Sequence, residues 1–479
     1  MLKKFFKKFF KENLDLAGAL DGSKAYKGPS IVQIDLTDKC NLNCVGCWCH
    51  SNFLGDSRLK KFEELPFDLL KKLIEDLHKM GIKEIILSGS GEPFMYPKIM
   101  EVISLIKEKD IKLNVITNFT LINKKIMKKL VELGVDNITA SIWAGDAGTY
   151  VKTHPNQTKK TFENIRENLK YLHSIKKGNN LPNVKIYNVI SKFNYDKIKN
   201  MLDFALDTLV DYIEFQVIDI IPGKTEALKL DEKDKKQVMN QAINFRRRGE
   251  YFDELIGTNH LKNFDKKHYN EFMEFGRFFK NTIGKDFRLK FHEQKVICPK
   301  GNSSIRMNVD QIQENAFKFS FPKGLCKNCS YHDQCSINKK DYVVKEEFLN
   351  LLGFGSFFRR ISNSSPKKNY DSNIINSMPC YVGWIYARIL TNGNVIPCCK
   401  AHLFPLGNLY ENSFKDIWFS NRYNEFRRKA KKLKKSDPYF KKIGCYKGCD
   451  NLGMNLEMHR KIKDLSFFQK KMLFKVKIS

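Results

Sequence analysis

The chain has 479 residues, more than one hydrophobic core usually organises, so we expect one large domain with smaller modules. A hydrophobic content of 42% excludes a disordered protein, and no apolar run is long enough to cross a bilayer. The formal net charge of +31 comes mostly from lysines spread along the chain, which indicates a solvated surface and makes nucleic-acid binding the less favoured interpretation. The thirteen cysteines follow no recognisable secretion signal, which predicts a reducing, cytoplasmic setting and metal ligation rather than disulfides.

Both ends of the chain combine phenylalanine with lysine. The first segment, residues 1–27, begins with LKKFFKKFFKE, which on a helix places phenylalanines on one face and lysines on the other. Such a helix either lies on an anionic membrane surface or docks its phenylalanines on the body of the protein. The basic tail, residues 461–479, contains LSFFQKKMLFKVKIS and leaves the same two alternatives open. We therefore consider a membrane surface, contacted peripherally, as one partner of this protein.

Residues 28–228 alternate strand and helix patterns, which predicts an α/β domain with a parallel sheet. Helical stretches such as 66–80 and 123–134 separate the strands, and Gly134 stands where a helix C-cap is expected. Six strand–helix units are fewer than the eight of a complete barrel, so we expect a partial (β/α)6 TIM-like barrel. The predicted strands are 31–36, 84–88, 112–117, 137–142, 184–190 and 212–218.

Several of these strands carry polar residues on one alternating face. A solid barrel interior would be filled with Val, Ile and Leu, so polar inward positions predict a wet, ligand-holding interior. The alternative is that these faces point outward. The residues are Gln33, Asp35, Asn114, Asn118, Thr139, Ser141, Glu214 and Gln216.

The remaining half predicts small cysteine-rich α+β modules. Residues 229–290 are charged and aromatic and read as a helical connecting region. A first cysteine-rich module is expected at 291–345, a Gly/Ser/Asn-rich linker at 346–376 and a second cysteine-rich module at 377–460.

Four cysteines crowd the sequence CNLNCVGCWCH, which begins at residue 40, just after the first predicted strand. Cys40, Cys44 and Cys47 have C-x3-C-x2-C spacing on one short loop. Three thiolates can bind three irons of a 4Fe-4S cluster and leave the fourth iron open. Structural zinc normally needs four ligands, and Cys49 or His50 is the fourth ligand that this alternative requires.

This loop resembles the signature of the radical S-adenosylmethionine (SAM) superfamily. The resemblance implies that the open iron binds the amino and carboxylate groups of SAM, and that an electron from the cluster produces a 5′-deoxyadenosyl radical. It also implies an electron donor such as a flavodoxin or ferredoxin. One departure is Gly46, since the residue before the last cysteine is usually aromatic; Trp48 stands just after that cysteine.

A second match is SGSGEP at residues 88–93, after the second strand. It resembles the family's GGEP turn, which contacts the methionine amino group of SAM, and so implies a SAM-binding role for Gly89, Ser90, Gly91 and Glu92. Glycine lets the backbone approach a ligand closely, and a carboxylate accepts hydrogen bonds from an ammonium. The resemblance also makes three polar residues of later strands candidates for SAM binding, although each is equally well an ordinary strand-end residue: Asn118, Ser141 and Asn188.

The C-terminal cysteines resemble the SPASM or twitch module of radical SAM enzymes. Cys380, Cys398 in GNVIPCC, and the pair Cys445 and Cys449 then imply a fully ligated auxiliary 4Fe-4S cluster. The closing pair departs from the commoner spacing by one residue. Cys399 is left out, because its side chain should point away from that of its neighbour.

A similar but degraded pattern precedes that module. Its four thiols suit either a second auxiliary 4Fe-4S cluster, which we prefer, or zinc. The residues are Cys298, Cys326, Cys329 and Cys335.

These observations predict an oxidoreductase-like radical SAM enzyme that abstracts a hydrogen atom from its substrate and uses auxiliary clusters for electron transfer. The substrate class is a small molecule, a sugar or a peptide; the few residues before the first strand favour a small molecule or sugar over a peptide. Glu214 is a guess for a catalytic base. The alternatives are a non-enzymic zinc protein that binds nucleic acid, and a radical SAM enzyme that modifies RNA.

Overall fold

The computed structural model describes residues 12–176, 181–231, 233–234 and 237–238, four strands between residues 291 and 345, and residues 378–475 except 436, 442, 444 and 446–448. The chain divides into two compact units, one formed by residues 1–231 with 371–479 and the other by residues 232–370. Most of the predicted helical region 229–290 lies outside the described residues, and so does the whole of the predicted linker 346–376. None of the helices in the described part of the chain has the length and hydropathy of a membrane span.

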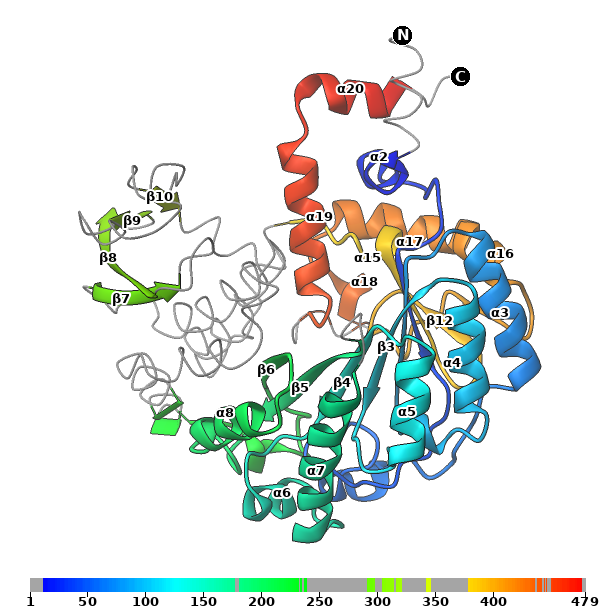
Figure 1. Ribbon diagram of the computed structural model, residues 1–479. Helices are drawn as coiled ribbons and strands as arrows, with labels where there is room; N and C mark the ends of the chain where they lie inside the picture. Colours follow the sequence, from blue (N-terminus) through cyan, green and yellow to red (C-terminus); the bar gives the residue numbers. More distant parts are fainter. Residues whose placement is uncertain are drawn as a thin grey trace. The chain divides into compact units, whose positions relative to one another are not determined.

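The first unit is built on a nine-stranded sheet with the order β13-β12-β11-β1-β2-β3-β4-β5-β6. Six consecutive strands pair in parallel, as alternating strands and helices require. These strands are β1 Ile31–Asp35, β2 Glu84–Ser88, β3 Lys112–Thr117, β4 Asn137–Ser141, β5 Asn183–Ile190 and β6 Tyr212–Val217. The helices between them, several of which are seen along one side of the sheet in Figure 1, are α3 Phe67–Lys79, α4 Ile99–Glu108, α5 Lys124–Glu132, α6 Ala147–Thr153, α7 Lys159–Ile175 and α8 Ile198–Asp207.

These elements agree with the predicted α/β alternation, and each strand begins and ends within one residue of its predicted bounds. Helix α5 has its side-chain cap at Asn123, which accepts a hydrogen bond from the backbone of Ile126. It ends before Gly134, whose φ of 66° is the left-handed conformation that favours glycine, so the predicted stop is confirmed.

The two faces of the sheet differ in polarity. Residues such as Val32 and Ile34 are fully buried in the core that the helices share with one face. Gln33 and Asp35 alternate with them and therefore lie on the opposite face, as do the polar residues of β3, β4 and β6. The sheet thus carries its polar side chains away from the helix layer, as the alternation predicted.

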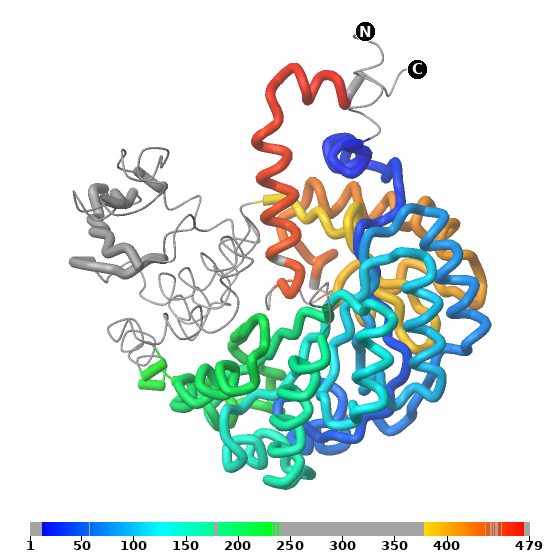
Figure 2. The backbone as a smooth tube through the Cα atoms, in the orientation of Figure 1, coloured from blue at the N-terminus to red at the C-terminus, as the bar shows by residue number. Residues whose placement is uncertain are grey.

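The C-terminal segment extends this same sheet. Strand β11, Tyr386–Ile389, pairs in parallel with β1, and β12, Asn394–Ile396, and β13, Gly407–Asn408, continue outward in antiparallel order. Figure 2 shows this segment, yellow to orange, beside the blue first strand. The indole N–H groups of Trp384 and Trp418 donate to the carbonyls of Lys24 and Lys27 at 2.9 and 2.8 Å. The ends of the unit are therefore joined by backbone pairing and by buried side chains.

The other helices of this unit belong to its N-terminal and C-terminal segments. Helices α2 and α20, although almost 450 residues apart in the chain, contact each other. The helices are α2 Leu14–Asp21, α15 Val382–Ile385, α16 Phe414–Phe419, α17 Asn421–Lys432, α18 Pro438–Lys441, α19 Leu452–Asp464 and α20 Phe467–Lys475.

The second unit contains a four-stranded antiparallel sheet with the order β10-β9-β8-β7. The four cysteines predicted for this region, Cys298, Cys326, Cys329 and Cys335, lie outside the described residues. Its strands are β7 Phe291–Ile297, β8 Ser304–Gln313, β9 Ala316–Ser320 and β10 Tyr342–Lys345.

Candidate active site

The loop after β1 carries three thiols, and backbone N–H groups of the loop donate to two of them. The sulfur of Cys40 accepts from the N–H of Leu42 at 3.4 Å, and that of Cys47 accepts from the N–H groups of Cys49 and His50 at 3.4 and 3.3 Å. Burial raises the pKa of Cys40 to about 12, so its thiolate form requires a nearby positive charge. An iron–sulfur cluster supplies that charge when it is bound. The donor set therefore fits the predicted cluster.

Asparagine side chains hold the cysteine loop in place. Asn41 donates to Thr120 Oγ1 at 2.8 Å and accepts from Asn118 at 2.9 Å. Its backbone carbonyl accepts from Asn156, which also exchanges hydrogen bonds with Asn43. Asn118, a predicted SAM contact, is thus brought to the cysteine loop, where it positions Asn41.

The glycine-rich turn packs directly against this loop. A Cβ at Gly91 would collide with the carbonyl oxygens of Lys39 and Thr37, so only glycine permits this approach. The backbone N–H of Glu92 donates to the same Lys39 carbonyl at 2.8 Å, and His50 Nε2 lies 2.9 Å from the carbonyl oxygen of Ser90. The cysteine loop and the glycine-rich turn, separated by some forty residues in sequence, are therefore in direct contact.

Glu92 connects the glycine-rich turn to the end of β3. Its buried carboxylate accepts hydrogen bonds from Thr117 Oγ1 and the backbone N–H of Asn118, both at 2.7 Å, and from the N–H of Phe94 at 3.2 Å. Burial raises the pKa of Glu92 to about 7. A ligand ammonium beside this carboxylate would favour its ionised form.

The other predicted contacts have different surroundings. Ser141 accepts a hydrogen bond from the indole N–H of Trp143 at 2.9 Å. Asn188 lies on the same buried face of β5 as Ile186 and Ile190, and its amide atoms have no hydrogen-bond partner among the described residues. Its placement lends no support to SAM binding, which stays a prediction. Glu214 forms a 2.7 Å ion pair with Lys185, an ordinary structural contact for a half-exposed carboxylate.

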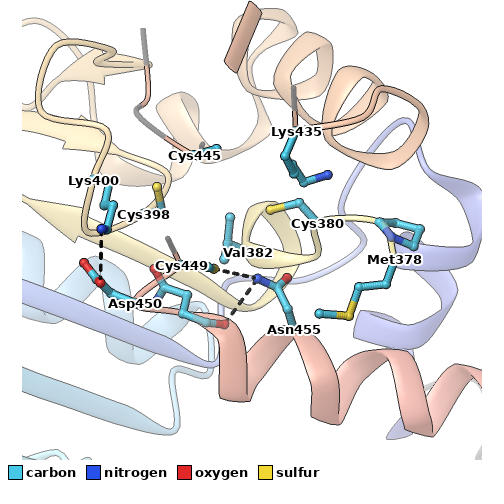
Figure 3. A pocket seen from close by; sticks show the side chains of 12 residues that line it. Met378, Cys380, Val382, Cys398, Lys400, Lys435, Cys445, Cys449, Asp450 and Asn455 are labelled. Carbon is cyan, nitrogen blue, oxygen red and sulfur yellow. Dashed lines mark hydrogen bonds and ion pairs between the residues drawn. The ribbon is translucent and has the colours of Figure 1, made fainter. Parts of the chain in front are cut away.

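Four predicted cluster ligands line one pocket in the C-terminal segment. Cys380 precedes α15, Cys398 follows β12, and Cys445 and Cys449 precede α19, yet all four face the space drawn in Figure 3. Burial raises the pKa of Cys445 to about 12, and those of Cys380 and Cys398 are also raised by burial. Four such thiols suit the predicted fully ligated 4Fe-4S cluster.

Polar groups surround this pocket. Lys435, which also lines it, points its ammonium at the carbonyls of Ala430 and Leu433, and Asn455 Nδ2 lies 3.7 Å from Cys449 Sγ. Cys399 is not among the lining residues. Its sulfur lies 3.1 Å from Tyr386 Oη, so it points away from the pocket as the sequence predicted.

Sequence reasoning missed three contacts between the two ends of the chain. Arg388 of β11 forms a bidentate pair with Asp35, with N–O distances of 3.0 and 2.7 Å. Tyr386 donates to Gln33 at 2.8 Å, and no local signal reveals either contact. Lys400 pairs with Asp219 at 2.6 Å and lies over the ring of Trp48, which connects the loop after Cys398 to the loop of the first three cysteines.

Within the described residues, no three Cys, His, Asp or Glu side chains are close enough to hold a single metal ion. The cluster assignments therefore rest on the loop and the pocket, and are proposals.

Two family models match the chain. The model of the radical SAM superfamily matches residues 34–205, and the SPASM model, an iron–sulfur cluster-binding domain, matches residues 380–445. The chain contains a radical SAM domain and a SPASM domain. The predicted recognition is thereby confirmed, and the two domains imply 4Fe-4S clusters and SAM as cofactors. The match to a superfamily of enzymes argues against the non-enzymic zinc protein.

Several curated proteins resemble this radical SAM chain. A tungsten-containing aldehyde ferredoxin oxidoreductase cofactor-modifying protein of Pyrococcus furiosus is 25% identical over 222 residues, which are 46% of this chain and 60% of the relative. A GTP 3′,8-cyclase of Clostridium perfringens is 29% identical over 221 residues, 43% of this chain and 62% of the relative. The chain thus spans about 60% of the length of these two relatives.

Solved structures resemble the chain more distantly. Streptococcus suis SuiB bound to S-adenosylmethionine is 14% identical, with a TM-score of 0.48 over 89% of this chain and 72% of SuiB. The structure of anSMEcpe with bound AdoMet is also 14% identical, with a TM-score of 0.48 over 93% of this chain and 96% of that one.

Proposed function

We propose that this protein cleaves SAM reductively and abstracts a hydrogen atom from its substrate. A 4Fe-4S cluster, when bound, supplies the electron that converts SAM to methionine and a 5′-deoxyadenosyl radical. Cys40, Cys44 and Cys47 would hold that cluster. The observation that carries the proposal is the packing of the glycine-rich turn on the cysteine loop, where Gly91 touches the backbone of Lys39.

The chain's own residues would then perform the positioning. Gly89 and Gly91 let the turn pack closely against Asp35 and the backbone of Lys39, so that the turn, with Ser90 between the two glycines, would contact SAM beside the cysteines. Glu92, anchored by Thr117 and the backbone of Asn118, would accept a hydrogen bond from the amino group of SAM. These contacts fix the sulfonium compound in one orientation, which is the main contribution a protein makes to cofactor chemistry.

The pocket of Cys380, Cys398, Cys445 and Cys449 would hold an auxiliary 4Fe-4S cluster. A cluster with four cysteine ligands has no open iron for SAM, so its proposed role is to accept or relay an electron from the substrate. The contact of Lys400 with Asp219 and Trp48 supports this role, because it brings the auxiliary segment to the cysteine loop. The first cluster would be reduced by a flavodoxin or ferredoxin in the cytoplasm.

We further propose a small-molecule or sugar substrate, with a peptide as the alternative. The curated relatives include proteins named for small molecules, among them the GTP 3′,8-cyclase and an Fe-coproporphyrin III synthase of Methanosarcina barkeri, 34% identical over 113 residues. The polar inner face of the sheet, with Gln33 and Glu214, suits a hydrophilic substrate.

Paired cysteine variants test these assignments. The anaerobically purified chain should contain about four irons per cluster, about eight for two clusters and about twelve for three. We expect Cys44→Ala to lose about four irons and all 5′-deoxyadenosine formation, whereas Cys398→Ala loses about four irons and still cleaves SAM. The matched controls are Cys49→Ala and Cys399→Ala, which should keep the full iron content. Wild-type protein that binds iron but never yields 5′-deoxyadenosine under reduction would refute the proposal. Protein that contains zinc in place of four of the irons would indicate that the module of Cys298 binds zinc.

A further inference from the structure

The side-chain amide of Asn455, in α19, faces the pocket of the four C-terminal cysteines. Asn455 is 3% exposed, and its Nδ2 donates to Cys449 Sγ at 3.7 Å, as Figure 3 shows. Its Oδ1 accepts a hydrogen bond from the backbone N–H of Tyr381 at 2.6 Å. Only the oxygen of an amide can accept that bond, so the orientation of the amide is fixed and its N–H groups face the sulfur.

Helix α19 uses one of these two N–H groups itself. Asn455 Nδ2 also donates to the carbonyl oxygen of Asn451, one turn earlier, at 3.2 Å. A neutral amide carries two N–H donors, so one serves this carbonyl and the other serves the sulfur of Cys449. The helix and Tyr381 together therefore hold one N–H donor at a predicted cluster ligand.

Charged side chains also line this pocket. They are two ammonium groups, of Lys400 and Lys435, and one carboxylate, of Asp450. Lys400 pairs with Asp219 at 2.6 Å and lies 3.7 Å from Asp450. Lys435 is 6% exposed, and its ammonium lies 3.4 Å from the carbonyl oxygen of Ala430, which places a second positive charge at the wall of the pocket.

The amide and the ammonium of Lys435 would act in the same direction on a bound cluster. An electron added to a 4Fe-4S cluster with four thiolate ligands increases the negative charge of a buried group. The reduction potential of such a cluster depends on the net charge around it and on hydrogen bonds to its sulfurs. Positive charge and N–H donors stabilise the reduced form and therefore raise the potential.

We propose that Asn455, by donating to Cys449, and Lys435, by its charge, raise the reduction potential of the auxiliary cluster so that it takes up an electron from the substrate. This inference rests on the proposed function of the pocket. The substrate would first lose a hydrogen atom to the 5′-deoxyadenosyl radical, and its radical would then lose one electron to the cluster and one proton to water. The substrate is thereby oxidised by two electrons. Asn455 is a positioning residue, since it acts through Cys449.

The test is a redox titration of the full-length chain, followed by electron paramagnetic resonance, in the Cys44→Ala background. That background lacks the first cluster, and the signal lost on adding Cys398→Ala identifies the cluster of this pocket. We expect Asn455→Leu to keep the iron and to lower the equilibrium constant for reduction about tenfold, which is about 59 mV for one electron. Lys435→Met should lower it by a similar factor.

A second substitution at the same position separates the donor from the fold. Asn455→Asp keeps an oxygen that accepts from the N–H of Tyr381 but replaces the donor with negative charge, so the potential should fall further than in Asn455→Leu. The matched control is Asn168→Leu on α7, because Asn168 also donates to a backbone carbonyl, that of Ile122, at 3.0 Å. This control should keep the potential of the parent chain.

The outcomes separate the inference from the proposed function. A cluster that keeps its potential in Asn455→Leu, or an equal fall in Asn168→Leu, would overturn the inference and leave the cluster assignment standing. Full iron content in Cys398→Ala would show that the pocket holds no cluster and would overturn both. If Asn455→Leu loses iron or its thermal unfolding midpoint falls sharply, Lys435→Met decides, and an unchanged potential there refutes the inference.

Discussion

At the scale of single residues, the ionisation of Glu92 should change the free energy of unfolding of the whole protein. Its pKa is raised by burial to about 7, against an ordinary value of 4.5, so the folded protein binds this proton more tightly than the unfolded chain. A raised carboxyl pKa gives stability that is present below about pH 4.5 and lost as the pH rises to about 7. The loss is at most about 3 kcal/mol.

We therefore expect Glu92→Gln to flatten the dependence of the unfolding free energy on pH between about 4.5 and 7. Chemical denaturation at several pH values measures this slope. The control, Glu101→Gln on the exposed face of α4, should leave the slope unchanged. A variant with the slope of the wild type would show that another group titrates in this range.

Gly91 is the second residue with a specific prediction. Replacement by alanine pushes the turn away from the backbone of Thr37, Asp38 and Lys39, and such overpacking costs about 1–3 kcal/mol. We expect SAM affinity to fall about tenfold or more, measured by equilibrium binding to the reconstituted protein. Gly453→Ala, near the start of α19 with open space around its Cβ, should change neither quantity. Unaltered SAM affinity in Gly91→Ala would separate the turn from the binding site.

At the scale of elements, the pairing of β11 with β1 depends on a buried ion pair. Asp35 is fully buried, and Arg388→Met leaves its carboxylate without a counter-charge, which costs about 3–5 kcal/mol. The double variant Arg388→Met with Asp35→Leu should regain most of this stability, because neither charge then remains. Chemical denaturation of the apo-chain gives both values. Lys429→Met, which breaks the exposed pair with Glu425, should cost less than about 1 kcal/mol.

The same elements show what a single sequence reveals. Strands such as Glu84–Ser88 were predicted to the residue because a short run of apolar side chains is a local signal. The partnership of β11 with β1 was not predicted, because Asp35 and Arg388 are 353 residues apart and each looks like an ordinary strand residue. The sequence therefore suggested the C-terminal module but not that its strands join the core sheet.

The candidate site was likewise predicted in part from the sequence. Spacing identified the thiols and the glycine-rich turn, because ligand chemistry imposes short, regular intervals. It did not distinguish the two faces of β5, so it did not reveal that Asn188, which alternates with Tyr187, lies among buried residues; its role as a SAM contact stays a prediction. Burial, unlike spacing, depends on helices that lie far away in the sequence.

At the scale of the whole molecule, the first unit is one folding unit made from both ends of the chain. One hydrophobic cluster contains Val32 of β1 and Ile389 of β11, and Lys431 of α17 donates to the carbonyl of Ala19 in α2. Residues 232–370 form a separate compact unit with a sheet of their own. Deletion of the C-terminal part of the first unit and deletion of the second unit should therefore have opposite effects.

We expect a chain that ends at residue 231 to aggregate, because β1 becomes an exposed edge strand and Asp35 stays buried without Arg388. A chain in which a flexible Gly/Ser linker of about 30 residues replaces residues 232–370 should stay soluble, since the core of the first unit is intact. Soluble yield and cooperative thermal unfolding by circular dichroism compare the two. If the chain ending at 231 unfolds cooperatively at the temperature of the wild type, the C-terminal strands do not stabilise the core. If the linker variant aggregates instead, the second unit is required for folding of the first.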